Sequence, residues 1–151
     1  MPKKKKILVV HGPNLNLLGL REKSIYGGLS LAEIVQKLGK RAETLGVEIE
    51  SFQSNEEGAM VSRIGAAIDE FDGIVINPAA YTHTSIAIRD ALLAARLPAV
   101  EVHLSNVDAR EEFRRRSMIS DIVVGKIQGF GYMSYILALD ALVHYLNDQE
   151  K

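Results

Sequence analysis

The chain has 151 residues, of which 47% are hydrophobic and 25% charged, a composition typical of a folded globular protein. With a formal net charge of −1, the chain has no excess of positive charge to attract nucleic acid or an anionic membrane. No apolar run approaches the ~20 residues of a membrane span. The absence of cysteine excludes disulfides, thiolate metal sites and a cysteine nucleophile, and it agrees with a reducing, cytoplasmic location.

Residues 1–5 are predicted to form a solvated basic tail, because a secretory signal would need a longer apolar segment than the one that follows. Beyond the tail, five short runs rich in β-branched residues alternate with longer segments of helical periodicity. Several of these runs are apolar on both faces, which is typical of parallel strands covered by helices on two sides. The predicted strands are 7–10, 47–52, 73–76, 99–104 and 119–126.

The segments between and after these strands are predicted to be helical. The first opens with a capping box, Ser30 with Glu33, and ends at Gly46. For the third, Thr84 or Ser85 is the expected cap. The predicted helices cover about 30–46, 55–71, 84–97, 109–116 and 132–147. The fourth is short and charged, and its arginines are predicted to form mostly a solvated face: Arg110, Arg114, Arg115 and Arg116.

Repeated strand–helix units predict an α/β fold with right-handed crossovers and helices on both faces of one sheet. At this length the best match is a flavodoxin-like, doubly wound five-stranded parallel sheet with strand order 2-1-3-4-5. No linker, internal repeat or low-complexity stretch interrupts the pattern. We therefore expect one domain over residues 1–151.

Polar residues gather where three of the predicted strands end. Asn14 follows the first strand, Asn77 and His83 follow the third, and His103 and Ser105 end the fourth. Ligands of open parallel sheets bind outside the carboxyl ends of the strands, so these five side chains are expected to converge. Taken singly, each has a structural alternative as a turn residue, a helix cap or a hydrogen-bonded core histidine.

The connection after the first strand is far longer than the ~2–6 residues usual for such loops. It carries Arg21 and Tyr26 together with several glycines that could serve as hinges. Long loops of this kind often act as active-site lids. The structural alternative for Tyr26 is an anchor that packs an apolar ring.

The histidines differ in what surrounds them. In an alternating strand His103 shares a face with Glu101 and Ser105, so a carboxylate and a hydroxyl could fix its tautomer. His11 is predicted to be structural and His144 to lie on the surface.

The chain lacks the motifs of several reaction classes. No Gly-x-Gly-x-x-Gly follows the first strand, and there is no P-loop, no His-Glu-x-x-His and no Gly-x-Ser-x-Gly. The remaining set of histidines, a tyrosine, arginines and amides suits proton abstraction beside a carbonyl, with donors for the enolate and a histidine that protonates a leaving hydroxyl.

Five separated segments resemble the signatures of the type II dehydroquinase family, in the same order. The resemblance covers nearly the whole chain. It implies a flavodoxin-like lyase that converts 3-dehydroquinate to 3-dehydroshikimate without a metal or an organic cofactor. The segments are His11-Gly-Pro-Asn14-Leu-Asn-Leu-Leu-Gly19, Arg21-Glu22 leading to Ile25-Tyr26-Gly27, Asn77-Pro78 leading to Thr82-His83-Thr84-Ser85, Glu101-Val-His103-Leu-Ser105-Asn106, and Arg110-Glu111-Glu112-Phe113-Arg114.

The resemblance also implies catalytic roles. Tyr26, as phenolate, would remove the C2 proton of the substrate, and a nearby cation, Arg21, would favour the ionised phenol and stabilise the enolate-like transition state. Asn14 would position a water that hydrogen-bonds the enolate oxygen. His103 would protonate the departing C1 hydroxyl, with Glu101 orienting its ring.

The remaining family positions imply substrate binding and assembly. Asn77, Ser105 and the Leu104 backbone would hold the substrate carboxylate. Ring hydroxyls would be held by His83, Arg114 and Asp90, the last from a neighbouring subunit. The family resemblance further implies a dodecamer built as a tetramer of trimers.

Two rival functions stay open on the sequence alone. A metal-dependent hydrolase could use His11, His83, His103 and Glu101, although their spacing matches no metal motif. A non-catalytic flavodoxin-like module could bind an anion at the same rim. The lid with Arg21 and Tyr26 disfavours the second rival, since simple binding has no use for an activated phenol.

Overall fold

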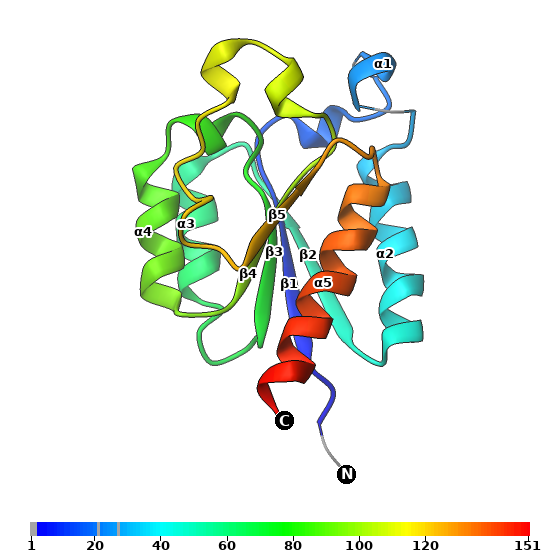
Figure 1. Cartoon of the computed structure of the whole chain (residues 1–151), viewed down its shortest axis with the longest axis vertical. Helices are drawn as coiled ribbons and strands as arrows, with labels where there is room; N and C mark the ends of the chain where they lie inside the picture. Colours follow the sequence, from blue (N-terminus) through cyan, green and yellow to red (C-terminus); the bar gives the residue numbers. More distant parts are fainter. Residues whose placement is uncertain (1–2, 21, 27) are drawn as a thin grey trace.

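The computed structural model describes residues 3–20, 22–26 and 28–151. Within them, five parallel strands form one sheet in the order β2-β1-β3-β4-β5, the flavodoxin-like order that the sequence predicted (Figure 1). The strands are β1 (Lys6–His11), β2 (Glu48–Gln53), β3 (Gly73–Asn77), β4 (Ala99–His103) and β5 (Gly125–Gln128).

Helices cover both faces of this sheet (Figure 1). They are α2 (Leu31–Leu45) and α5 (Met133–Gln149) on one face and α3 (Glu57–Gly65) and α4 (Ile86–Ala95) on the other. The short helix α1 (Lys23–Tyr26) lies beyond the carboxyl ends of the strands (Figure 1). Successive side chains of β1 point to opposite faces of the sheet and so contribute to two separate hydrophobic clusters. Ile7 and Val9 pack with residues of α2 and α5, whereas Leu8 and Val10 pack with residues of α3 and α4.

Helix boundaries follow local chemistry where a cap is present. Ser30 Oγ accepts a hydrogen bond from the Glu33 backbone N–H, and the Glu33 side chain accepts one from the Ser30 N–H, so α2 begins with the predicted capping box. Gly46 ends α2 in the left-handed region at φ 72°. Ser85 caps α4 by accepting from the Ile88 N–H. These three predictions are confirmed.

Three predicted elements differ in the structure. The predicted strand 119–126 is wrong: β5 begins at Gly125, and the residues before it form turns whose apolar side chains still pack on the core, Ile119 among them. The predicted helix 109–116 is instead two short 3₁₀ turns, η3 (Val107–Ala109) and η4 (Glu112–Arg114). The second helix ends at Gly65 rather than at 71, and Ile68, beyond its end, is 47% exposed.

Candidate functional site

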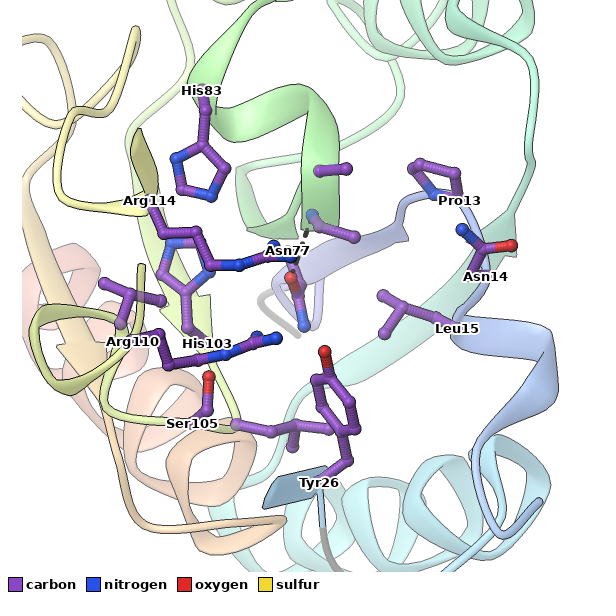
Figure 2. Close-up of a pocket in the computed structure, with 14 residues that line it drawn as sticks. Pro13, Asn14, Leu15, Tyr26, Asn77, His83, His103, Ser105, Arg110 and Arg114 are labelled. Carbon is purple, nitrogen blue, oxygen red and sulfur yellow. Dashed lines mark hydrogen bonds between the residues drawn. The ribbon is translucent and has the colours of Figure 1, made fainter. Parts of the chain in front are cut away.

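A pocket lies at the carboxyl ends of β1, β3 and β4, where the sequence predicted convergence (Figure 2). Its walls come from the loops that follow these strands, from α1 and from the η3–η4 segment. The lining residues are Pro13, Asn14, Leu15, Tyr26, Asn77, Ala79, Ala80, His83, His103, Leu104, Ser105, Val107, Arg110 and Arg114.

The loops after β1 and β3 meet closely at the floor of the pocket. The Gly12 N–H donates to the Asn77 carbonyl at 2.8 Å, and a Cβ on Gly12 would lie 2.3 Å from the Pro78 carbonyl oxygen. Only glycine allows this approach. Next to it, Asn14 adopts φ 67°, a conformation that asparagine tolerates better than most residues, and its N–H donates to the Asn55 side chain at 2.9 Å.

His103 is held from behind by a buried carboxylate. Its Nε2–H donates to Glu101 Oε2 at 2.6 Å, and Glu101 is fully buried. This bond leaves Nδ1 as the ring nitrogen available to a ligand. The predicted pairing of His103 with Glu101 along one strand face is therefore confirmed as a contact.

Two serines complete the surroundings of Glu101. Ser117 Oγ donates to both carboxylate oxygens at 3.2 and 3.1 Å, and Ser120 Oγ donates at 2.6 Å. Burial alone raises the pKa of Glu101, but the hydrogen bonds from His103 and Ser120 and the charges of His103 and Lys126 outweigh it, so the net pKa is lowered. Glu101 is thus an anion inside the protein, suited to stabilise a positive charge on His103.

His83 faces the pocket with its ring orientation fixed by the backbone. Its Nδ1–H donates to the Arg116 carbonyl at 2.8 Å, so Nε2 is the nitrogen that a ligand can reach. Burial lowers the pKa of His83, and the charges of His103 and Arg114 lower it further, against the raising effect of the Arg116 bond and Glu101. A neutral His83 would accept a hydrogen bond from a ligand hydroxyl.

Tyr26 reaches the pocket from α1 and faces an arginine. The Arg110 guanidinium carbon lies 5.1 Å from the centre of the Tyr26 ring, within cation–π range. Figure 2 shows the side chains of Arg110 and Arg114 extending into the pocket from the same side, towards Tyr26 and Asn77. Arg114 is steadied by two hydrogen bonds to Glu111, at 2.9 and 3.4 Å. Two guanidinium groups in one cavity favour an anionic ligand.

The predicted site residues fall into three groups. Glu101 does not line the pocket but bonds the His103 ring from the protein interior. Asp90 is exposed on α4 and is not one of the described residues that line the pocket of its own chain. Arg21 lies outside the described residues. The others line the pocket: Asn14, Tyr26, Asn77, His83, His103, Leu104, Ser105 and Arg114.

Sequence reasoning missed several contributors. The interpretation of Arg110 as part of a solvated face is wrong, since it lines the pocket with its side chain 17% exposed. For Arg114, 22% exposed, the pocket position implied by the family resemblance holds rather than the solvated face. The spacing of charged residues in the sequence could not show that Arg110 and Arg114 face the pocket, because two 3₁₀ turns replace the expected helix and direct these side chains inward. Ser117 and Ser120 were also missed, and their spacing from Glu101 carries no recognisable motif.

Neither a metal cluster nor a membrane helix is found in the part of the chain that the structure describes. No group of three or more histidine, aspartate or glutamate side chains there is arranged to hold a metal ion. His11, one ligand of the metal-site alternative, lies in the core and bonds Tyr135 and Ser51 instead. No helix within these ranges is long and apolar enough to span a bilayer.

Comparison with known proteins gives consistent matches over most of the chain. The family model described as dehydroquinase class II matches residues 5–143. The 3-dehydroquinate dehydratase of Geotalea daltonii is 60% identical over 141 residues, covering 93% of this chain and 98% of that protein. The crystal structure of a type II dehydroquinase from Butyrivibrio crossotus is 48% identical, with a TM-score of 0.89 over 92% of this chain and 97% of that one. A dehydratase-like protein from Bifidobacterium longum is more distant, at 33% identity and a TM-score of 0.70.

Proposed function

The chain belongs to the dehydroquinase class II family, and on that premise we propose that it dehydrates 3-dehydroquinate to 3-dehydroshikimate. The observation that carries the proposal is one pocket lined by both a phenol and a histidine, with arginines and amides beside them. A phenol can serve as a base, a histidine as an acid, and the cationic and amide groups can bind a carboxylate substrate.

The first step is removal of a proton. Tyr26, ionised, takes a proton from C2 of the substrate, and the electron pair moves into the adjacent ketone to give an enolate. The family assigns the supporting cation to Arg21. The Arg110 guanidinium, which lies against the Tyr26 ring, is a second cation close to the base. Asn14 positions a water that donates to the enolate oxygen.

The second step is loss of water. The enolate re-forms the ketone, the new C1–C2 double bond forms, and the C1–O bond breaks as His103 gives its proton to the leaving hydroxyl. Glu101 stabilises the protonated imidazole, consistent with its lowered pKa and its direct bond to Nε2. The route needs no metal and no organic cofactor, and the products are the enone and water.

The substrate is held at its carboxylate and its ring hydroxyls. Asn77 and Ser105, with the Leu104 backbone, bind the carboxylate, while His83 and Arg114 bind hydroxyl groups. These roles follow the family positions, and they are supported by the fact that all five residues line one pocket.

Assembly and location complete the proposal. We place residues 1–151 in one catalytic domain of a cytoplasmic homo-dodecamer, a tetramer of trimers, with Asp90 reaching the pocket of a neighbouring subunit. Exposure of Asp90 on α4, away from its own pocket, is compatible with that role. The same chemistry would serve aromatic biosynthesis or quinate breakdown.

The direct test mixes the purified protein with 3-dehydroquinate and follows ultraviolet absorbance, because the conjugated enone carboxylate of the product absorbs where the substrate does not. Turnover is expected to survive both EDTA and borohydride added with substrate. Inactivation by borohydride in the presence of substrate would indicate a trapped imine, and the enolate route would then be abandoned for a lysine-based one.

The shared site has its own test. Asp90→Asn and Tyr26→Phe should damage different subunits' contributions to one site, so oligomers refolded from a mixture contain some sites that lack neither residue. Activity above that of either variant alone is expected. Absence of recovery in oligomers verified as mixed would remove Asp90 from the neighbour's site.

A further inference from the structure

The buried carboxylate of Glu101 divides its two oxygens between different partners. Oε2 accepts from His103 Nε2–H, and Oε1 accepts from Ser120 Oγ, each at 2.6 Å. Ser117 Oγ lies at nearly equal distances from the two oxygens, 3.2 Å from Oε1 and 3.1 Å from Oε2. Ser117 therefore does not distinguish one oxygen from the other, whereas Ser120 does. The proposed mechanism gives neither serine a role.

The two hydroxyl groups also differ in their other bonds. Ser117 Oγ accepts from the N–H groups of Ile119 and Ser120, at 3.2 and 3.1 Å, so it holds the backbone turn as well as the carboxylate. Within the described part of the chain, the Ser120 hydroxyl makes one hydrogen bond, the one to Glu101. Since an ionised carboxylate can only accept, the single proton of the Ser120 hydroxyl lies in that bond.

The turn that carries both serines is anchored independently of Glu101. The Met118 N–H donates to the Thr82 carbonyl at 2.8 Å, and Arg89 Nη1 donates to the Met118 carbonyl at 2.9 Å. These two bonds hold the turn against the segment that follows β3 and against α4. The hydroxyl of Ser120 can therefore be removed while the turn keeps its place.

We infer that Ser120 is a positioning residue for the general acid, because its bond to Oε1 keeps Glu101 Oε2 directed at His103 Nε2. The terminal torsion of a glutamate side chain is broad, so a single bond at Oε2 does not define the plane of the carboxylate. A second, charge-assisted bond at Oε1 does define it. The ring of His103 is then held with Nδ1 towards the pocket. The inference rests on the proposed function, in which His103 protonates the leaving hydroxyl.

The first test measures turnover of 3-dehydroquinate by Ser120→Ala. Loss of the bond to Oε1 should lower kcat about tenfold. KM should change by less than about twofold, because neither serine is among the described residues that line the pocket. A loss confined to KM would overturn the inference, since Ser120 would then act on substrate binding rather than on the acid.

A matched pair of variants separates the hydroxyl from the packing of the side chain. Ser120→Thr and Ser120→Val have nearly the same shape and differ in a hydroxyl against a methyl group. Any cost of the added bulk is therefore common to both. The threonine variant should retain at least about fivefold more kcat than the valine variant. A residue that only fills space would give equal kcat values.

A double-mutant cycle tests whether Ser120 acts through Glu101. In Glu101→Gln the carboxylate that orients His103 is already lost. Adding Ser120→Ala to that variant should therefore change kcat by less than about twofold. Losses in kcat that add across the cycle would show that Ser120 acts by some other route.

Two further serines control for stability and for the substitution itself. Ser117→Ala removes the acceptor of the turn, so it should lower Tm more than Ser120→Ala does, with a smaller loss of kcat. Ser62→Ala, an exposed serine on α3, should change neither quantity. All variants are assayed well below their own Tm.

The outcomes separate this inference from the proposed function. Equal kcat values for Ser120→Thr and Ser120→Val, or additive losses in the cycle, would overturn the positioning role while leaving the dehydratase intact. A wild-type protein without turnover of 3-dehydroquinate would overturn the proposed function itself.

Discussion

The two groups proposed to move protons in this pocket are held in different ways. His103 belongs to the sheet: it ends β4, is 5% exposed, and is bonded to a carboxylate that two serines also hold. Tyr26 lies outside the sheet, half-buried at the end of the four-residue helix α1, with its ring against Arg110. The acid is therefore held at a buried strand end, whereas the base lies on a short helix and packs its ring against the edge of the core.

This difference predicts that substitutions around Glu101 on β4 affect both catalysis and stability, whereas substitutions at Tyr26 on α1 affect catalysis without affecting stability. Changes around Glu101 disturb buried hydrogen bonds and should lower both activity and stability. Changes at Tyr26 should lower activity alone. Four measurements test the contrast.

Tyr26→Phe carries the largest expected effect. Loss of the base should lower kcat about 1000-fold, within the range for general acid–base catalysis. The Tm should move by less than about 2 °C, since the ring is kept and the residue is only half-buried. Steady-state kinetics and thermal unfolding of the same preparation check both parts. A near-normal kcat would require a different base.

Glu101→Gln should lower kcat about 100-fold and also destabilise the fold by about 2 kcal/mol. The neutral amide cannot stabilise a charged His103, and its NH₂ group meets the hydroxyl donors of Ser117 and Ser120. Glu112→Gln, an exposed carboxylate change nearby, is the matched control. A loss of kcat with unchanged unfolding free energy would show that the acid is not built into the fold as argued.

Stability should also depend on pH through His11, which is buried at the end of β1. Its pKa is about 4 in the folded chain against 6.5 for the ordinary group, because burial disfavours the charged ring. The unfolded chain binds this proton first as the pH falls, so stability should decrease between pH 6.5 and 4, by about 3 kcal/mol in total. Urea unfolding across that range, compared with His11→Asn, isolates the contribution. Parallel curves for the two proteins would contradict it.

Arg110→Ala carries the smallest expected effect, about tenfold in kcat/KM with little change in Tm, since a partly exposed cation–π contact contributes only about 1 kcal/mol. The loss should appear mainly in kcat, because the contact helps to hold the Tyr26 ring in position for proton abstraction. Arg110→Lys should recover part of it, and Arg115→Ala, an exposed arginine of the same segment, should have no effect. Equal losses at Arg110 and Arg115 would point to a general charge effect instead.

Sequence patterns were sufficient to predict those structural features that residues close together in the chain determine. The capping box at Ser30 and Glu33 fixed the start of α2, and alternation along β4 placed His103 beside Glu101. The alternation of strands and helices gave the sheet order, because crossovers between parallel strands allow few topologies. The convergence of Asn77, His103 and Ser105 then followed from the rule that ligands bind at strand ends.

The tertiary structure decided what depends on distant partners. Residues 119–124 are β-branched enough to resemble a strand, but Ser117 Oγ bonds the N–H groups of Ile119 and Ser120 and holds a turn. Arg110 faces the pocket only because 3₁₀ turns replace a helix. His11 looks the same in sequence whether it lies in the core or faces a ligand. Its partner Tyr135 is 124 positions away, and only folding brings the two rings to 5.3 Å.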